Sequence, residues 1–483
     1  MLGLGSLPIA IPLRGNISPS LVELQHLNYL DPSNNNFGGS RIPEFIGSLS
    51  NLRHLNLSYA GFGGTVPSQL GNLSKLQSLD LSPYGGMNVQ NLEWLSHLSS
   101  LRHLNLQNVD LSNAKEWFQS VNKLPLLTSL RLGLCRLPKI VVPSYINFST
   151  SLAILDLSGN GLTSSSFDWL FNFSSALIEV DLSNNRLQAT IPSWFWDLSP
   201  RMRLLNISYN QINGIMPDLS LKFPAFPAID LSSNHFAGPI PFLPCTATSL
   251  NLSKNKFSGS VSFLCTIKFE QLTRLDLSDN IIDGEVPDCW MQFTYLDVLN
   301  LANNNLTGKI PRSLGSILKL KVLQLRNNSF TGELPLPLRN CINLIIIDLG
   351  DNRISGTIPT WIGESLSMLV VFSLRSNEFH GSIPTNFCQL NNIQILDLSL
   401  NNISGTIPMC LDNFLAMTQT KRFDPTIYVI YDQTYTIRDG EEGYYSPHYV
   451  LSALLVWKGR EYEYKNTLGL VKSIDLSKFQ AIS

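Results

Sequence analysis

Charge is scarce in this sequence. Charged residues make up 14% of the 483 residues, whereas an average soluble domain has roughly 25%. The net charge is −2, and basic residues occur as isolated pairs such as Lys421 and Arg422 rather than as clusters. Because nucleic-acid binding needs a basic patch, we do not expect nucleic acid as a partner.

Long hydrophobic runs are also absent. No apolar stretch approaches the roughly 18 to 20 residues that span a bilayer, so the sequence as given contains no membrane anchor. The apolar start, Met1 to Leu13, has neither a basic segment nor a small-residue cleavage site. We interpret it as the tail of an earlier repeat rather than as a signal peptide.

Catalytic motifs are missing as well. There is no G-x-S-x-G elbow, phosphate-binding loop, H-E-x-x-H or kinase signature. Paired carboxylates suggest glycosidase chemistry in principle, but the Asp residues here recur at the period of a repeat, which indicates a structural stripe. The stripe consists of Asp156, Asp181, Asp276, Asp348 and Asp397. His54 and His103 likewise occupy equivalent positions of two repeats. We therefore predict no enzyme activity, no cofactor and no metal site.

What the sequence does contain is a repeat. The pattern L-x-x-L-x-L-x-x-N-x-L recurs almost from end to end, and from Asn160 onward its Asn position returns every 21 to 25 residues. Alternating Leu residues such as Leu299 and Leu301 predict a short strand with one buried face. The Asn amide is expected to satisfy backbone groups where the chain leaves the strand. Cys135 occupies the same position, so we expect it to be structural rather than reactive.

Many repeats continue with G-x-I-P, as in Gly308 to Pro311, Gly356 to Pro359 and Gly405 to Pro408. Gly permits a tight backbone and Pro disfavours a helix, so an extended segment and a short turn are expected there. This signature resembles that of plant extracellular leucine-rich repeats. The resemblance implies an α/β repeat fold: a leucine-rich-repeat solenoid forming a right-handed superhelical arc with a concave parallel β-sheet.

The repeats are interrupted once. They stop after Leu411 and resume near Val471, and the segment between them holds eight of the fourteen tyrosines. Because linkers are poor in aromatic residues, we expect an ordered excursion that binds a partner; the alternative is a segment that only packs on the repeats. We assign residues 1–412 to about 16 repeats, 413–470 to an island domain, here called the insert, and 471–483 to the start of a resumed repeat.

Two segments sharpen the resemblance. Residues 92–104 look like early repeats of plant receptor-like proteins, and residues 457–477 are similar to the end of the island domain in the ethylene-inducing-xylanase receptor group. The resemblance implies an ectodomain of a cell-surface receptor-like protein in plant innate immunity, at the extracellular face of the plasma membrane. Its expected partners are a microbial protein or peptide ligand and co-receptor kinases. Members of that family have a signal peptide, a membrane helix and a cysteine-paired cap. We do not find these three features in the sequence as given. We therefore expect membrane attachment to require a segment that the given sequence lacks.

Two alternatives remain open. The first is a secreted inhibitor or decoy of a microbial cell-wall-degrading enzyme, against which the insert argues, because such inhibitors have an uninterrupted solenoid. The second is the ectodomain of a hormone-receptor kinase, which also carries an island.

Seven cysteines, an odd number, show no zinc-binding spacing. Equal offsets in neighbouring repeats predict the disulfides Cys265–Cys289 and Cys388–Cys410, although Cys245 could compete for Cys265. The sequence also contains ten N-x-S/T sequons, which agree with secretion. They are Asn16, Asn56, Asn72, Asn147, Asn172, Asn206, Asn251, Asn305, Asn327 and Asn402.

A binding surface can be proposed from strand alternation. The concave face just before the insert should present Val322, Gln324 and Arg326 from one repeat and Val371, Ser373 and Arg375 from two repeats later. Interface hot spots are rich in Tyr, Trp and Arg. The alternative is that both arginines only pair with nearby acids such as Asp348 or Glu378. The predicted ligand and partner residues are Gln324, Arg326, Ser373, Arg375, Tyr428, Tyr431, Tyr435, Tyr444, Tyr445 and Trp457.

Overall fold

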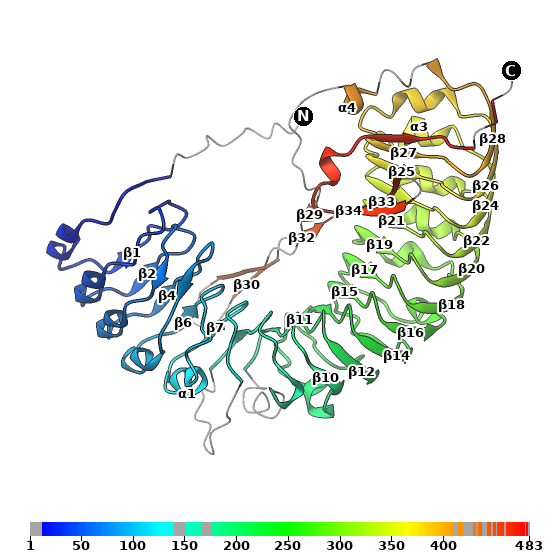
Figure 1. Cartoon of the computed structure of the whole chain (residues 1–483). Helices are drawn as coiled ribbons and strands as arrows, with labels where there is room; N and C mark the ends of the chain where they lie inside the picture. The colour runs from blue at the N-terminus through cyan, green and yellow to red at the C-terminus, as the bar shows by residue number, and fades with distance from the viewer. Residues whose placement is uncertain are drawn as a thin grey trace. The chain divides into compact units, whose positions relative to one another are not determined.

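The computed structural model describes residues 12–139, 151–166, 176–409, 411, 414–418, 428–430, 433–436, 442–445, 448–450, 452–457, 460–478 and 480–481. By its internal contacts the chain divides into two compact units. The first comprises Met1–Gly214 and Lys222–Asn234, and the second comprises Ile215–Leu221 and His235–Ser483. Each unit is a stack of repeats (Figure 1).

Each repeat contributes one short strand to a parallel sheet, and within each unit the strands of neighbouring repeats pair in register. We call these the main strands. In the first unit they are β1 (Tyr29–Leu30), β2 (His54–Asn56), β4 (Ser78–Asp80), β6 (His103–Asn105), β7 (Ser129–Arg131), β8 (Ile154–Asp156), β9 (Glu179–Asp181), β11 (Leu204–Asn206) and β13 (Ala228–Asp230). In the second unit they are β15 (Ser249–Asn251), β17 (Arg274–Asp276), β19 (Val298–Asn300), β21 (Val322–Gln324), β23 (Ile346–Asp348), β25 (Val371–Ser373), β27 (Ile395–Asp397) and β35 (Ser473–Asp475). The predicted leucine-rich-repeat solenoid is thus confirmed, and β35 pairs directly with β27 across the insert.

A second row of parallel strands follows the Asn position. In the first unit it holds the pair β3 (Gly64–Thr65) and β5 (Met87–Asn88) and the pair β10 (Gln188–Thr190) and β12 (Gln211–Ile215). In the second unit it holds β14 (His235–Pro239), β16 (Lys256–Gly259), β18 (Ile281–Glu285), β20 (Asn305–Lys309), β22 (Ser329–Gly332), β24 (Arg353–Thr357), β26 (Glu378–Gly381), β28 (Asn402–Gly405) and β36 (Gln480–Ala481). Its glycines allow close stacking: a Cβ on Gly308, whose φ is +79°, would lie 2.8 Å from Cγ of Glu285 in the preceding repeat.

Short helical turns close most repeats. Pro311 immediately precedes one of them, so the extended segment and short turn expected around G-x-I-P are present. Among the described residues, the α-helical turns are α1 (Trp117–Val121), α3 (Trp361–Ser365) and α4 (Leu415–Thr418). The 3-10 turns are η1 (Pro19–Glu23), η2 (Glu44–Ser48), η3 (Ser68–Asn72), η4 (Glu93–His97), η5 (Ser164–Ser166), η7 (Ser193–Asp197), η8 (Ser262–Cys265), η9 (Trp290–Gln292), η10 (Arg312–Ser316), η11 (Leu336–Asn340), η12 (Thr385–Gln389) and η15 (Leu468–Leu470).

The Asn position holds neighbouring repeats together. Asn304 Nδ2 donates to the carbonyls of Leu277, Leu301 and Ala302 at 3.0 to 3.2 Å, while its Oδ1 accepts from the Ile282 backbone 3.1 Å away. Two of these partners belong to the preceding repeat. Because an unpaired buried backbone group is costly, this side chain replaces hydrogen bonds that the sheet cannot supply at the turn. The predicted role of the Asn ladder is confirmed.

Cys135 takes the Asn position in the first unit. Its Sγ lies 3.0 Å from the carbonyl oxygen of Leu106, and burial raises the pKa of the thiol to about 12. A thiol with that pKa stays protonated near neutral pH and is a poor nucleophile. The structural interpretation of Cys135 is therefore supported.

Candidate functional site

The predicted binding residues lie on one face of the sheet in the second unit. In the main strands from β15 to β27 the middle residue, such as Leu299 or Leu323, is buried in the repeat core. Side chains alternate along a strand, so the first and third residues form the opposite surface, which we call the sheet face. Val322 and Gln324 occupy these positions in β21, and Val371 and Ser373 occupy them in β25.

Five consecutive main strands carry an aliphatic residue at the first position of the sheet face. We call this set the apolar stripe: Val298, Val322, Ile346, Val371 and Ile395, each at most 1% exposed. It is covered by the insert hairpin β33 (Ala453–Trp457) and β34 (Arg460–Tyr464), which lies over the main strands in Figure 1. Ala453, Leu455 and Leu468 are buried against the stripe, and Tyr464 packs beside them.

Burying a Val or Ile side chain stabilises a structure by about 1.5 to 3 kcal/mol. Five such residues in register provide a strong reason for the hairpin to dock where it does. One polar contact accompanies the apolar ones, because Nε2 of Gln324 donates to the carbonyl of Ser452 at 3.3 Å. The insert is thus fixed on the sheet face through part of its own surface.

Three residues that were predicted to be exposed on the sheet face are buried. Gln324 is 8% exposed, Arg326 4% and Ser373 4%, so the expectation that they face a partner on an open surface is wrong. The residues lie where alternation placed them. The insert contacts Gln324 on this face, and acidic side chains surround Arg326.

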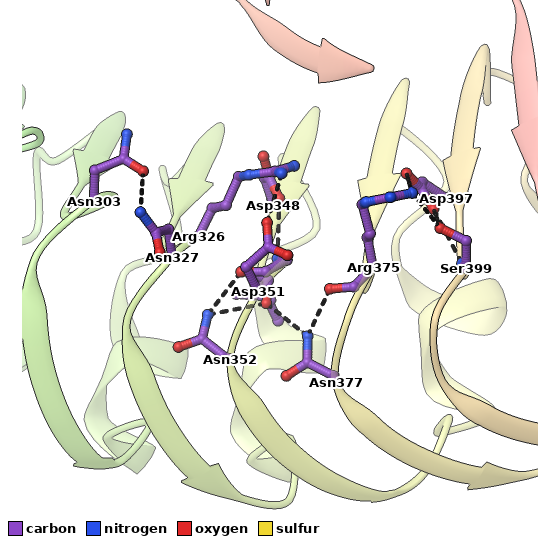
Figure 2. Close-up of polar contacts among 12 residues, drawn as sticks. Asn303, Arg326, Asn327, Asp348, Asp351, Asn352, Arg375, Asn377, Asp397 and Ser399 are labelled. Carbon is purple, nitrogen blue, oxygen red and sulfur yellow. Dashed lines mark hydrogen bonds and ion pairs between the residues drawn. The ribbon is translucent and has the colours of Figure 1, made fainter. Parts of the chain in front are cut away.

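Arg326 belongs to a buried ion-pair network (Figure 2). Its Nη2 lies 2.5 Å from Oδ2 of Asp351. Burial raises the pKa of the neighbouring Asp348, while the Arg326 guanidinium acts in the opposite direction. Gly350 stands where most repeats have Ser, and a Cβ there would lie 3.2 Å from Oδ1 of Asp348 and 3.5 Å from Nη1 of Arg326. The missing side chain leaves room for the guanidinium.

Arg375 connects three repeats. Its Nη1 lies 2.7 Å from Oγ of Ser399, 3.5 Å from Oδ2 of Asp475 and 3.7 Å from Oδ2 of Asp397. The pairing of both arginines with acids agrees with the structural alternative, and Asp348, one of the two acids named there, lies beside Arg326. Because Asp475 follows the insert in sequence, Arg375 also joins repeats on either side of it.

The aromatic residues of the insert lie in antiparallel strand pairs. β29 (Tyr428–Ile430) pairs with β32 (His448–Val450), and β30 (Gln433–Thr436) pairs with β31 (Glu442–Tyr445). Tyr428 is in β29, Tyr435 in β30, Tyr444 and Tyr445 in β31, and Trp457 in β33; Tyr431 lies outside the described residues. The insert is therefore ordered strand structure at these positions, as its aromatic content predicted.

Sequence reasoning missed the residues that the docked hairpin leaves exposed. Tyr462 of β34 is 44% exposed, and its neighbour Glu463 is also exposed. Burial raises the pKa of Asp279, which follows β17, and the nearby carboxylate of Glu463 acts in the same direction. The available signal was the apolar stripe, because aliphatic residues at a normally polar strand position indicate that something covers them.

The cysteine positions agree with the predicted offsets. Cys265 and Cys289 form a disulfide, and Cys245, which competed for Cys265 in the prediction, is a free, exposed thiol. Cys388 is disulfide-bonded, but Cys410, its predicted partner, lies outside the described residues. Cys341 is free and buried.

The sequons differ in accessibility. Asn251 is 6% exposed, and its Oδ1 accepts a hydrogen bond from Oγ of Ser253 at 2.7 Å. Asn56 and Asn206, also on main strands, are half-buried. Asn147 and Asn172 lie outside the described residues. The exposed sequons are Asn16, Asn72, Asn305, Asn327 and Asn402.

The recurrent Asp residues act as local caps. Asp156 Oδ1 accepts hydrogen bonds from the backbone N–H and the hydroxyl of Ser158 at 2.9 and 2.7 Å, and Asp397 binds Ser399 in the same way. This supports their interpretation as a structural stripe. Within the described ranges we find neither a metal-binding group of His, Cys, Asp or Glu nor a helix long and apolar enough to cross a membrane.

Comparison with known proteins identifies the family. A model described as Leucine-rich repeat region matches residues 13–214, and the Leucine Rich Repeat model matches residues 271–293, 295–317, 319–341, 343–365 and 392–414. The chain belongs to the leucine-rich-repeat family.

Within that family the matches are plant receptor-like proteins. Receptor-like proteins EIX1 and EIX2 of Solanum lycopersicum are 42% and 41% identical over 164 residues, which is 33% of this chain and 16% of each relative. The chain therefore matches about a sixth of the length of these relatives. Over the matched residues the chain is similar to plant leucine-rich-repeat receptor-like proteins of the EIX group.

Solved structures show the same fold. The ectodomain of the Arabidopsis receptor kinase HAESA, in complex with an IDA peptide hormone, has a TM-score of 0.65 and 28% identity, covering 84% of this chain and 67% of that one. The plant peptide hormone receptor RGFR1 with RGF2 has a TM-score of 0.57 and 23% identity, covering 83% and 75%. The second supports the fold alone.

Proposed function

We propose that this chain is the recognition ectodomain of a cell-surface receptor-like protein in plant innate immunity, and that it binds a microbial protein or peptide. The observation that carries the proposal is the docking of the insert hairpin on the apolar stripe. A fixed hairpin presents Tyr462 and Glu463 in a defined position beside Asp279. Exposed Tyr on a rigid support provides contact area at low entropic cost.

The proposed binding platform consists of Tyr462, Glu463 and Asp279. Gln324 supports it from beneath through its hydrogen bond to Ser452. Signalling would proceed through partner receptor kinases at the plasma membrane. The relatives named receptor-like proteins support this part of the proposal.

A hormone-receptor ectodomain is the second candidate. It is favoured by the likeness to HAESA, which was solved with a peptide hormone and covers most of this chain. Under this candidate the same platform would bind an endogenous peptide rather than a microbial protein.

The test displays the full chain on yeast and measures binding of two labelled probes, a fungal xylanase and a fungal polygalacturonase. The variant Tyr462→Ala/Glu463→Lys alters the platform, and Glu378→Lys on β26 is the control at another exposed strand glutamate. We expect binding of one probe to fall by about tenfold, which is 1.4 kcal/mol, in the platform variant and to stay unchanged in the control.

Three outcomes contradict the proposal in different ways. Equal binding by all variants places the site elsewhere on the chain. Inhibition of the bound enzyme identifies a decoy or inhibitor. Binding of synthetic plant peptide hormones, with neither microbial probe bound, favours the second candidate.

A further inference from the structure

A second surface of the second unit carries exposed apolar side chains. It lies at the turn before each main strand, between two buried core positions such as Phe293 and Leu296. We call the row of these turns in the second unit the turn edge. Its exposed large residues are Tyr295 (46%), Leu318 (58%), Ile342 (57%), Met368 (50%) and Leu470 (58%).

The repeats of this chain provide their own comparison. The same two turn positions hold Ser50 and Asn51, Ser74 and Lys75, or Ser99 and Ser100 in the first unit. Polar residues are therefore compatible with the turn, and the fold does not require Leu, Ile or Met there. Four successive repeats nevertheless expose a large apolar side chain. A contiguous apolar row rimmed by polar groups marks an interaction site more often than chance exposure does.

The turns lie side by side. Nδ2 of Asn343 donates to the carbonyl of Leu318 at 2.8 Å, and Nδ2 of Asn392 donates to the carbonyl of Ser367 at the same distance. The main strands that follow are paired in register, with a spacing of about 4.8 Å between neighbours. The apolar side chains consequently form a continuous ridge rather than isolated spots.

The chain itself shows what kind of element fits this ridge. At the turn of Asn391 and Asn392 the short helix α4 is seated on the edge, and the backbone N–H of Ala416 donates to the carbonyl of Asn391 at 3.0 Å. Phe414 and Ala416 are buried there, while Leu415 is 50% exposed and continues the row. A short helix with one apolar face thus already occupies the next turn along the same edge.

Charge indicates the rest of the partner's chemistry. Among the turn positions from Thr294 to Met368 the charged residue is Lys319, whose Nζ lies 4.5 Å from the ring centre of Tyr295. Lys321 follows at the start of the next strand and pairs with Asp297 at 3.4 Å. Asp297 compensates the charge of Lys321, so Lys319 is the positive charge on the turn positions, and a lysine beside an apolar ridge is complementary to apolar residues flanked by carboxylates.

We propose that the turn edge is a docking surface for an amphipathic helix of a partner protein, apolar on one face and acidic beside it. The surface is distinct from the platform of the proposed function and does not depend on it. A second copy of this chain fits less well, since two identical edges would bring their lysines together.

The test uses the full chain displayed on yeast and a labelled synthetic helical peptide of about 18 residues, long enough to hold a helix. One peptide has a Leu face flanked by Glu, and a second has the Glu residues replaced by Lys. The first variant replaces three apolar residues of the turn edge by the polar residues found at the same positions in the first unit: Leu318→Ser/Ile342→Ser/Met368→Asn. Leu126→Ser is the matched control, because Leu126 is 45% exposed at the same turn position in the first unit.

We expect the Glu peptide to bind, binding to fall about tenfold in the triple variant, and Leu126→Ser to have no effect. The Lys peptide should bind more weakly than the Glu peptide, and Lys319→Glu should reverse that preference without touching the core. Equal binding by the wild type and the triple variant, or an unchanged preference in Lys319→Glu, overturns the proposal. Binding of the soluble chain to the displayed chain, lost in the triple variant while neither peptide binds, overturns it in favour of a second copy.

Discussion

At the scale of single residues, the second unit contains buried charged groups beside the sheet face. The Arg326 side chain is 5% exposed and pairs with Asp351, whose side chain is 31% exposed, and Asp348 is 5% exposed beside it. Removing one partner of a buried pair leaves the other charge without compensation. These residues therefore act through the stability of the platform rather than through direct contact.

Arg326→Ala should lower the free energy of unfolding of the second unit by about 3 kcal/mol, because it leaves the buried Asp348 without its counterion. The control is Arg353→Ala at an exposed position of β24, in the second row of strands. Its free energy of unfolding should stay within about 0.5 kcal/mol of the wild-type value. Denaturant unfolding followed by tryptophan fluorescence gives both values. A loss no larger for Arg326→Ala than for Arg353→Ala would refute the buried-pair account.

The pKa of Asp348 gives stability a definite pH dependence. Burial raises the pKa of Asp348 above its unfolded value of about 3.9, so the folded state binds the proton more tightly than the unfolded state. The contribution of this group to stability is therefore present at low pH and is lost as pH rises through its raised folded pKa. Above pH 4, the free energy of unfolding should decrease less steeply with rising pH in Asp348→Asn than in the wild type.

Asp110 serves as a control because its pKa is shifted in the opposite direction. The hydrogen bonds from Ser112 lower its pKa, so its contribution is present above the unfolded pKa and disappears as pH falls through the folded pKa. Asp110→Asn should weaken the loss of stability below pH 4 and leave the higher range unchanged. Unfolding midpoints measured from pH 3 to pH 8 distinguish the two variants, and identical profiles for both would contradict these pKa directions.

At the scale of elements, one disulfide joins two neighbouring turns. Cys265 ends η8 and Cys289 precedes η9, with 24 residues of sequence separation. A cross-link over a loop of that length removes entropy from the unfolded chain equivalent to about 3 kcal/mol. The disulfide therefore stabilises the stack just before the strands that carry the apolar stripe.

Replacing both cysteines by Ser should lower the free energy of unfolding by about 3 kcal/mol. Cys245→Ser is the matched control, because that thiol is free and exposed, and it should have little effect. Thermal unfolding under oxidising conditions measures both. If reducing agent destabilised the double variant as much as the wild type, another disulfide would be responsible.

Much of the repeat architecture could be predicted from sequence because its rules are local. The Asn position, the alternating Leu residues and the G-x-I-P segment each fix their own part of one repeat, and Asn304 behaves as its template position requires. Register then follows, because each strand can bury its Leu only against the next repeat. Cys265 and Cys289 could be paired for the same reason.

The site could be predicted only in part because it depends on contacts distant in sequence. Alternation placed Gln324 and Ser373 on the sheet face, but what covers them comes from Ser452 to Leu468, more than 70 residues later. The repeat rule treats the first strand position as solvent-facing. Val322 and Ile346 violate that rule, and this violation was the evidence for a covering element.

At the scale of the whole molecule, the sequons sort by position on the repeat. Those on main strands are enclosed to different degrees, whereas Asn72 and Asn305 are exposed away from the sheet face. Mass spectrometry of the chain secreted from plant cells should find glycans on Asn72 and Asn305 and none on Asn251, whose amide is 6% exposed. A folded chain fully glycosylated at Asn251 would contradict the enclosed geometry of β15.

The central claim is that the insert is fixed on the sheet face by the apolar stripe, since the proposed recognition platform depends on it. Hydrogen exchange of the backbone amides in β33 and β34 of the full chain tests this most directly. Val322→Ser/Val371→Ser removes two stripe residues worth together about 3 kcal/mol, and Ile281→Ser, 54% exposed on β18, is the control. We predict slow exchange in the wild type and the control and exchange about 100-fold faster in the stripe variant. Exchange in β33 and β34 that is as fast in the wild type as in the stripe variant would contradict the account.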